Sequence, residues 1–441
     1  MPEILNSDVV DVNSATFGGC FLRNTSIAEV IEGLLESKSM FLNRDVLRST
    51  YVPEYLPHRD REVEALLKIL VVALRGDTPS NILIYGKTGT GKTAVTTHVG
   101  DELENVGAKR GIPCKVLYMN CEVIDTQYRL LANLARSFGK RIPMTGWPTD
   151  QVYSEFRSAV DSTEQVVVII LDEIDKLMKK GDDVLYSLSR INSTLDHAKV
   201  SLVGISNDLT FTEFLDPRVR SSLGEEEIVF PPYNADQLSD ILRQRAEMAF
   251  GNESLSNEVI SLCAALAARE HGDARKALDL LRVSAELAER DGSMVVHVNN
   301  VRKAQSKIES DRVEEVVVTL PTQSKLLLYG ITLLDKATES MRKPSGRKIM
   351  STGEVYRIYK RMCAVLDLDV LTQRRITELI SELDMLGIVN ATVVNRGRYG
   401  MTKEISLETP ADHVHRMLVT DTRLQPLLDM KFNSFQAQLG M

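Results

Sequence analysis

The chain has 441 residues, of which 43% are hydrophobic and 26% charged, so its composition is that of a globular protein and excludes a collagen, a coiled coil or a wholly disordered chain. Its 53 Lys and Arg against 61 Asp and Glu give a net charge of −8, which on its own argues against nucleic acid as the partner. The longest aliphatic run is Val166–Leu171, whereas a membrane-spanning helix needs about 20 apolar residues. We therefore expect no membrane partner.

Two further features bear on the cellular compartment. The 5 cysteines are scattered and form no C-x-x-C pair, so we expect reduced thiols rather than disulfides or a zinc site. The first residues, Met-Pro-Glu-Ile, are not a basic stretch followed by an apolar one, which predicts no secretory signal. The expected location is the cytoplasm.

Residues 1–50 are polar, with Asn, Ser and Thr scattered through them, and predict a weakly ordered N-terminal arm. A candidate core follows over residues 51–232. It opens with apolar residues at i, i+3, i+4 and i+7 over 62–74, which is typical of an amphipathic helix. Short apolar segments then alternate with helix-like ones, and this alternation predicts a parallel sheet with helices on both faces. The candidate strands are Ile82–Tyr85, Lys115–Met119, Val166–Leu171, Val200–Ile205 and Ile228–Phe230.

Strand signals stop after Pro231-Pro232, and residues 233–315 are expected to form a helical domain. A strong apolar stripe runs along the third candidate helix, which predicts a small helical bundle. The expected helices are Asp236–Ala249, Ser256–His271, Ala274–Asp291 and Val298–Asp311.

From residue 316 the pattern changes to three helices followed by two strands, which we assign to a third domain over residues 316–410. Residues 411–441 are left as a C-terminal tail with one candidate helix and no clear motif. The expected elements of the third domain are helices Thr322–Ser340, Ser351–Leu366 and Thr372–Leu386 and strands Ile388–Val394 and Thr402–Leu407.

Residues 86–93 fit the phosphate-binding pattern G-x-x-x-x-G-K-[ST] at every position. They follow a candidate strand and precede a helix-compatible stretch, the context that this pattern needs. Glycines let backbone N–H groups surround phosphates, and the helix N-terminus adds partial positive charge. We expect Lys92 to reach the β- and γ-phosphates of a nucleotide and the Thr93 hydroxyl to bind Mg²⁺. The loop consists of Gly86, Lys87, Thr88, Gly89, Thr90, Gly91, Lys92 and Thr93.

Polar residues also end two of the candidate strands. Asp172 and Glu173 follow Val166–Leu171, and Asn207 follows Val200–Ile205. In a parallel sheet, the carboxyl ends of the strands face the ligand crevice. We expect Asp172 to hold Mg²⁺ directly or through water, Glu173 to polarise the attacking water, and Asn207 to orient it. For each of them the alternative is a polar turn residue.

Three arginines are candidates for contact with the γ-phosphate. Arg218 and Arg220 can stabilise charge in the transition state, from a neighbouring subunit if chains assemble. Arg275 follows Gly272-Asp273 at the start of a helix, and we expect it to make the position of the helical domain depend on the nucleotide. Surface salt bridging is the alternative for the first two, and an ordinary capping turn for the third.

In this order the elements resemble those of AAA+ ATPases. More closely, the chain is similar to the archaeal replication initiators, a family related to the largest eukaryotic origin-recognition subunit and to the cell-division-control helicase loader. The similarity covers about residues 40–408. It rests on Leu56-Pro57-His58-Arg59, Asn81–Thr93, Thr145–Thr149, Gly204–Asp208, Ser222–Tyr233, Arg269–Arg275, Leu371–Arg375 and Leu383–Val389.

The resemblance implies an α/β fold: an AAA+ core with a parallel sheet, a helical lid and a C-terminal winged-helix domain. It implies ATP or ADP with Mg²⁺ at the phosphate loop, and it places Tyr233 at the nucleotide. Pro57, His58 and Arg59 are implied to lie near the adenine, with a plain interdomain turn as the alternative. The insert around Gln127–Trp147 is implied to carry an initiator-specific helix that touches DNA.

The third domain carries DNA-binding signals of its own. Thr372–Leu386 has one apolar face, and its start is polar and basic on the opposite face. In a helix-turn-helix fold, the N-terminal residues of the recognition helix reach base edges in the major groove, where Arg can read guanine and Gln adenine. The basic and aromatic hairpin tip at 396–400 suits a wing on a phosphate backbone or in the minor groove. A solvated helix face is the alternative for the arginine pair. The expected DNA contacts are Thr372, Gln373, Arg374, Arg375, Arg396, Arg398 and Tyr399.

Local charge supports this assignment. Residues 321–410 hold 14 Lys and Arg against 10 Asp and Glu, a net of +4, which leaves −12 for the rest. An acidic body weakens nonspecific association with DNA. Together with these signals, the resemblance implies a cytoplasmic, nucleoid-associated replication initiator with a slow ATPase as its switch. The partners that the resemblance implies are double-stranded origin DNA, the minichromosome-maintenance helicase and paralogous initiators. The alternatives are a winged-helix transcription regulator with an ATPase sensor and an AAA+ ATPase that remodels proteins.

Overall fold

The computed structural model describes residue 32 and residues 38–124, 126–143, 145–178, 183–210, 215–251, 254–337, 349–395 and 401–428. They belong to two compact units, one up to Ala304 and one from Gln305. The boundary lies inside helix α12 (Val298–Thr319). Within the described ranges, no helix is long and apolar enough to cross a membrane.

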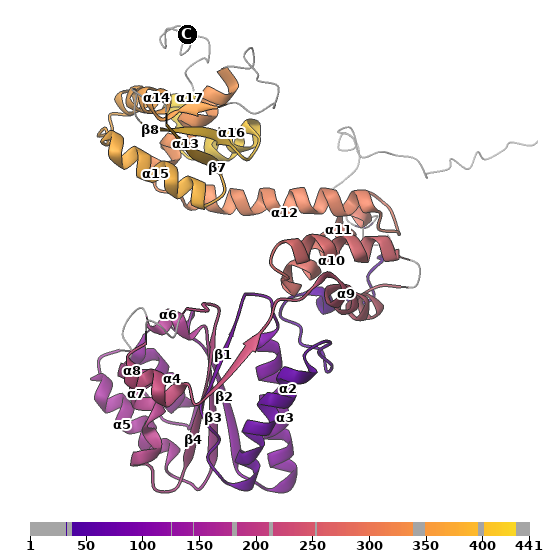
Figure 1. The fold of residues 1–441 in the computed structure, drawn as a ribbon, viewed down its shortest axis with the longest axis vertical. Helices are drawn as coiled ribbons and strands as arrows, with labels where there is room; N and C mark the ends of the chain where they lie inside the picture. The colour runs from indigo at the N-terminus through magenta and orange to yellow at the C-terminus, as the bar shows by residue number, and fades with distance from the viewer. Residues whose placement is uncertain are drawn as a thin grey trace, which may run out of the picture. The chain divides into compact units, whose positions relative to one another are not determined.

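The first unit is built on a parallel five-stranded sheet with helices on both faces (Figure 1). The strand order is β2-β3-β4-β1-β5. Each strand lies where an apolar segment predicts one, so the α/β class is confirmed. The strands are β1 (Ile82–Gly86), β2 (Cys114–Asn120), β3 (Val166–Asp172), β4 (Lys199–Ser206) and β5 (Glu226–Phe230).

Strand β3 illustrates how the sheet is buried on both faces. All of its residues are buried, and successive side chains of a strand point to opposite faces. Val167 and Ile169 belong to the core that includes residues of α4–α8, whereas Val168 and Ile170 belong to the core of α2 and α3. The helices are α2 (Asp60–Leu70), α3 (Lys92–Arg110), α4 (Gln127–Ser137), α5 (Thr149–Val160), α6 (Ile174–Met178), α7 (Asp183–Ser189) and α8 (Pro217–Leu223).

The parallel register brings the polar motifs to one edge of the sheet. Tyr85 pairs with Ser206, and Asp172 pairs with Ile205. The residues that follow β1, β3 and β4 therefore leave the sheet side by side, as expected at the carboxyl ends of parallel strands.

The lid of the first unit contains α9 (Ala235–Ala249), α10 (Asn257–Arg269), α11 (Ala274–Arg290) and the start of α12. α9, α10 and α11 each begin at a side chain that accepts a backbone N–H bond, which stabilises a helix start. α12 continues to Thr319, past the predicted end at Asp311, because no Gly or Pro interrupts the chain before Leu320-Pro321. The capping residues are Asn234, Ser256 and Asp273.

The end of the segment predicted to be a weakly ordered arm packs on the lid instead. Phe41 contacts Phe250 with ring centroids 5.0 Å apart, and the Leu42 N–H donates to the Ala249 carbonyl (2.8 Å). Met40, Val46 and Leu47 are buried. These apolar residues are few and lack helical spacing, so the sequence does not reveal their packing. We call residues 40–58 the N-terminal strap. Residues 1–31 and 33–37 of the predicted arm lie outside the described residues.

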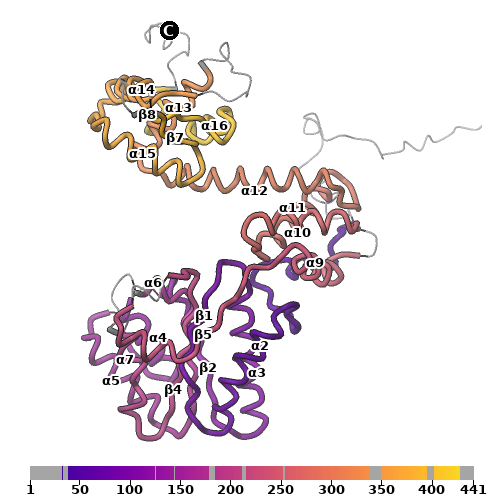
Figure 2. Tube along the Cα trace, in the orientation of Figure 1, coloured from indigo at the N-terminus to yellow at the C-terminus, as the bar shows by residue number. Residues whose placement is uncertain are grey.

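The second unit has a winged-helix fold, as predicted (Figure 2). Its antiparallel sheet has the order β6-β8-β7. The sequence does not predict β6, because two residues are too few for an alternating pattern. The first part of the predicted tail forms α16 and α17, which pack into the same core. The elements are α13 (Thr322–Ala337), β6 (Met350–Ser351), α14 (Thr352–Val365), α15 (Gln373–Met385), β7 (Val389–Asn395), β8 (Met401–Leu407), α16 (Ala411–Val419) and α17 (Gln425–Leu428).

Candidate functional site

The phosphate loop joins β1 to α3 and depends on its glycines. Gly91 caps α3 with φ of +90°, so the helix begins at Lys92. Gly89 has φ of +70°, and a Cβ there would lie 1.7 Å from Asp273 Oδ1. A side chain at position 89 is therefore excluded by both backbone conformation and space. A loop of this kind at a helix N-terminus offers backbone N–H groups to an anion.

Lys92 is the buried cation of the loop, with 5% of its surface exposed. Its Nζ donates to the Gly86 carbonyl, the Lys87 carbonyl and Asn207 Oδ1, each at 2.8 Å. Burial lowers the pKa of this ammonium to about 8, because a charged group is costly to desolvate. All three acceptors are neutral, so phosphate oxygens would be better partners for Lys92.

Thr93 and Asp172 lie together, as expected for a shared Mg²⁺ ion. The Thr93 hydroxyl donates to Asp172 Oδ2 (2.7 Å), and the Tyr118 hydroxyl donates to the same oxygen (2.8 Å). Burial and the Asp172 charge raise the pKa of Tyr118. A hydroxyl and a carboxylate are hard oxygen ligands, and Mg²⁺ usually takes only one or two protein ligands besides phosphates and water. The residues therefore fit the ion.

Glu173 follows β3 in a left-handed backbone conformation, with φ of +53°. Such conformations are rare for non-glycine residues and cluster at functional sites. Burial, together with the charges of Glu122 and Asp172, raises the pKa of Glu173, as suits a proton acceptor. Both Glu173 and Asn207 line the same cavity as Lys92.

The lid touches the phosphate loop directly. The Ala274 N–H, at the start of α11, donates to the Gly89 carbonyl (3.1 Å). Asp273 caps this helix by accepting from the Arg275 N–H (2.8 Å). Arg275 lines the cavity, and its charge contributes to lowering the pKa of Lys92. The predicted lid arginine therefore lies beside the loop.

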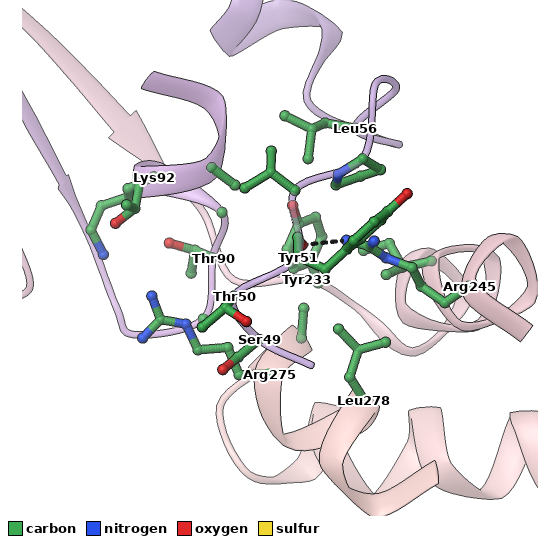
Figure 3. Close-up of a pocket in the computed structure, with 18 of the residues that line it drawn as sticks. Ser49, Thr50, Tyr51, Leu56, Thr90, Lys92, Tyr233, Arg245, Arg275 and Leu278 are labelled. Atoms are coloured by element: carbon green, nitrogen blue, oxygen red, sulfur yellow. Dashed lines mark hydrogen bonds between the residues drawn. The ribbon is translucent and has the colours of Figure 1, made fainter. Parts of the chain in front are cut away.

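These residues surround a cavity of about 290 Å³ (Figure 3). From the loop it is lined by residues 89–94; Gly86, Lys87 and Thr88 are not among the described residues that line it. Pro57, expected near the adenine, and Tyr233, expected at the nucleotide, both line the cavity. The side chains of His58 and Arg59 are absent from the described lining.

Arg59 is hydrogen-bonded to the phosphate loop and to the segment that follows β5. It is 2% exposed, and its guanidinium donates to the Thr90 carbonyl (2.9 Å), the Pro231 carbonyl (2.6 Å) and the Tyr233 hydroxyl (3.0 Å). His58 Nε2 lies 3.0 Å from Asp240 Oδ2 on the lid. The bonds of Arg59 give it a bracing role at the loop, and its place near the adenine stays a prediction.

Arg218 and Arg220 lie apart from this cavity. Both are on the exposed side of α8, and neither is among the described residues that line it. Arg218 pairs with Asp216 at 3.0 Å. A contact with the nucleotide of a neighbouring subunit stays a prediction for both.

Three parts of the site are missing from the sequence predictions. Tyr118 lies near the carboxyl end of β2, which pairs with β3. A polar residue at the carboxyl end of a predicted strand is a signal that could have identified it. The strap contributes Ser49–Pro53 to the cavity, and α9 contributes Gln244 and Arg245. These segments carry no local motif, since only the tertiary fold brings them to the loop.

In the second unit, α15 presents the predicted DNA-reading residues to solvent. Ile376 and Leu379 are buried on its inner face, and Gly387 follows the helix in a left-handed conformation (φ of +72°), as is common just after a helix end. Leu386, the last residue of the predicted helix, is 43% exposed, because it lies past the last helical turn. The exposed residues at the start of α15 are Thr372, Gln373, Arg374 and Arg375. Arg396, Arg398 and Tyr399 lie outside the described residues.

Two glutamates accompany the arginines on this surface. Glu378 lies 3.0 Å from Arg375 and 3.5 Å from Arg374, and Glu382 lies 3.4 Å from Arg375. The arginines are therefore paired in the absence of DNA.

In the first unit, the predicted insert does contain a helix, α4, which buries Leu130 and Leu134. Its contact with DNA stays a prediction.

Known proteins match all three parts of the chain. The AAA domain family matches residues 75–210, the Cdc6 AAA+ ATPase-type lid domain residues 239–306, and the CDC6 C-terminal winged helix domain residues 315–417. The chain is 61% identical over 414 residues to ORC1-type DNA replication protein 1 of Methanosarcina mazei, covering 94% of this chain and 99% of that protein. The chain belongs to the family of ORC1-type DNA replication proteins. The family resemblance drawn from the sequence is thus confirmed.

Other members of the family agree. The ORC1-type DNA replication protein of Pyrococcus furiosus is 56% identical over 416 residues, covering 93% of this chain and 97% of that protein. Among solved structures, the Aeropyrum pernix ORC1 protein in complex with DNA matches with a TM-score of 0.76 and 48% identity, over 88% of this chain and 98% of that one. Pyrobaculum aerophilum CDC6P, 24% identical with a TM-score of 0.54 over 86% of this chain and 99% of that one, shares the fold. This ORC1-type chain thus combines an AAA domain, a lid and a winged helix.

Proposed function

We propose that this ORC1-type protein is an ATP-dependent replication initiator that binds double-stranded origin DNA and helps to load the replicative helicase. The observation that carries the proposal is the contact between α11 and the phosphate loop, Ala274 N–H to Gly89 carbonyl at 3.1 Å. Because Arg275 follows directly and lines the same cavity as Lys92, a triphosphate there joins the lid to the core. The lid then responds to the presence of the γ-phosphate.

The chain's own residues account for a slow ATPase. The loop amides and Lys92 bind the phosphates, and Thr93 and Asp172 hold Mg²⁺, which when bound neutralises developing charge on the phosphate oxygens. Glu173 accepts a proton from the attacking water, and Asn207 orients that water. Arg275 stabilises negative charge on the γ-phosphate. Arg218 or Arg220 adds a cation from a neighbouring initiator, which is how paralogues enter the proposal.

The second unit supplies DNA recognition. Gln373, Arg374 and Arg375 are exposed at the start of α15, where a recognition helix meets base edges. Support comes from the Aeropyrum pernix relative, whose solved structure is a complex with DNA. The minichromosome-maintenance helicase is the proposed downstream partner, and the proposed location is the nucleoid in the cytoplasm.

The test measures ATP affinity and binding of labelled duplex DNA by the full chain. Lys92→Ala removes a buried charge contact and should weaken ATP binding by about 100-fold. Lys109→Ala, an exposed lysine at the end of the same helix, is the control and should change nothing. Lys92→Ala protein that still binds ATP tightly would contradict the nucleotide site.

Arg374→Ala with Arg375→Ala tests the DNA interface in the same assay. Loss of each base-reading arginine should cost about 1–3 kcal/mol of binding free energy and relax sequence specificity at its position. The double variant should therefore bind the origin duplex more weakly and distinguish it less from a duplex of scrambled sequence. Arg416→Ala, an exposed arginine on α16, is the control. An unchanged affinity and an unchanged preference for the origin duplex would contradict recognition by α15.

A further inference from the structure

The lid helix α9 carries buried polar atoms without partners at the cavity. Arg245 is 5% exposed, and its Nη2 donates to the Tyr51 carbonyl (3.1 Å). Within the part of the chain that the structure describes, its Nε and Nη1 contact no acceptor. Next to it, Gln244 donates from Nε2 to the Tyr55 carbonyl (3.0 Å), while its buried Oε1 receives no hydrogen bond there. Buried polar atoms are rarely left unpaired, so these three indicate a polar ligand.

The position of these atoms identifies the part of the ligand they meet. Gln244 and Arg245 line the same cavity as the phosphate loop. Figure 3 places Lys92 and Arg245 on opposite sides of it. Since Lys92 marks the end that takes phosphates, Arg245 marks the end that takes the sugar and base. Tyr51, whose ring centroid is 4.7 Å from the Arg245 guanidinium carbon, and Leu278 offer surfaces for a planar base.

The hydrogen-bonding character of both side chains is fixed by the strap. The Tyr55 carbonyl can only accept, which orients the Gln244 amide with Nε2 toward it and leaves Oε1 as an acceptor. A guanidinium can only donate. The cavity therefore presents an acceptor beside a donor. The 6-amino group of adenine donates, and the ring nitrogens on either side of it accept, whereas guanine and hypoxanthine carry an accepting oxygen at position 6.

We propose that Gln244 and Arg245 determine base specificity. Gln244 Oε1 accepts a hydrogen bond from the 6-amino group of adenine, and Arg245 donates to a ring nitrogen beside it. The inference deepens the proposed function and rests on it, because it requires a nucleoside triphosphate in this cavity. It also gives the strap a part in base selection, since the Tyr51 and Tyr55 carbonyls hold both side chains in place.

The experiment compares the affinities of Mg-ATP and Mg-ITP for the full chain. ITP keeps the sugar and triphosphate and replaces the 6-amino group with an oxygen. The wild-type protein should bind ATP at least about tenfold more tightly than ITP, because one base contact of this kind discriminates by that much or more. Gln244→Leu should remove this preference, because it should lower the affinity for ATP and leave the affinity for ITP unchanged. The proposal is overturned if the wild-type protein binds ATP and ITP with equal affinity. It is also overturned if Gln244→Leu lowers the affinities for ATP and ITP equally.

Arg245→Met separates recognition from a structural role. It should weaken ATP binding about tenfold, while the melting temperature of the nucleotide-free protein stays the same or rises, because an unpaired buried charge is removed. A lower melting temperature with unchanged ATP affinity overturns the assignment of Arg245. Arg243→Met, at an exposed neighbour paired with Asp240, is the control and should match the wild type.

Lys92→Ala distinguishes failure of this inference from failure of the proposed function. It should lower the affinities for ATP and ITP by the same factor, because it removes a contact with the phosphates that both nucleotides carry. If Lys92→Ala leaves both affinities unchanged, the nucleotide site itself is wrong and the base assignment falls with it. If Lys92→Ala lowers both affinities but the wild-type protein binds ATP and ITP equally well, only the base assignment fails.

Discussion

Glu378 should restrain DNA binding by α15, and Glu378→Gln should therefore strengthen it. The Glu378 carboxylate lies 3.0 Å from Arg375 and 3.5 Å from Arg374. The hydrogen bond from Arg375 holds the pKa of Glu378 below its ordinary value, so the group is ionised at neutral pH. Both arginines must leave it to reach phosphates or bases. A gain of affinity is also more informative than a loss, since damage to the fold does not produce it.

The size of the gain follows from the exposure of the pairs. The Arg374 side chain is 92% exposed and that of Glu378 46%, so each pair is weak and screened by salt. Releasing two such pairs, together with one negative charge fewer near the phosphates, should tighten binding about two- to fivefold. The arginines that contact DNA are unchanged, so the gain should shrink as salt rises.

Fluorescence anisotropy of a labelled duplex with the full chain measures this at 0.1 and 0.3 M salt. Glu315→Gln makes the same change of charge at an exposed position on α12 and is the control. An affinity that is unchanged or weaker in Glu378→Gln refutes the reasoning. So does an equal gain in both variants, because net charge alone would then explain it.

Three further substitutions test the fold. Gly89→Ala should weaken ATP binding at least about tenfold, because strain and the clash with Asp273 displace the loop; unchanged affinity in a calorimetric titration would contradict this. Phe41→Ala should lower the melting temperature and expose the strap to proteases, because it loses its contact with Phe250; a wild-type melting curve would contradict the packing. Asp161 accepts backbone N–H bonds from residues 196, 197 and 198, which lower its pKa to about 2. Asp161→Asn should therefore be less stable than the wild type above about pH 4. The difference should fade as pH falls toward 2, and a difference independent of pH would refute the ionic origin.

Elements with strong local signals are the ones that sequence reasoning found. The strand Val166–Leu171 is apolar at every position, and the phosphate loop requires glycines at fixed spacing. Each of these features depends on residues within one short segment, because burial requires apolar residues in the strand and phosphate binding requires glycines in the loop. Such features can be predicted without knowing what they pack against.

Features set by contacts distant in sequence were missed or misplaced. Phe41 gives no signal until Phe250 lies beside it. Arg59 donates to the Thr90 and Pro231 carbonyls and the Tyr233 hydroxyl, and no motif around residue 59 indicates these partners. Gln244 and its neighbour lie in an ordinary amphipathic helix, and only their unpartnered buried atoms distinguish them. Partners of this kind follow from the tertiary structure and not from spacing along the chain.

The central claim is that this ORC1-type protein acts at replication origins through an ATP-controlled contact with DNA. Genome-wide mapping of its binding sites, in the organism that encodes it, against the points where replication starts tests that claim most directly. We expect binding sites to coincide with start points and to be lost there in a Lys92→Ala strain. Binding confined to promoters, with none at start points, would contradict the account and favour a transcription regulator.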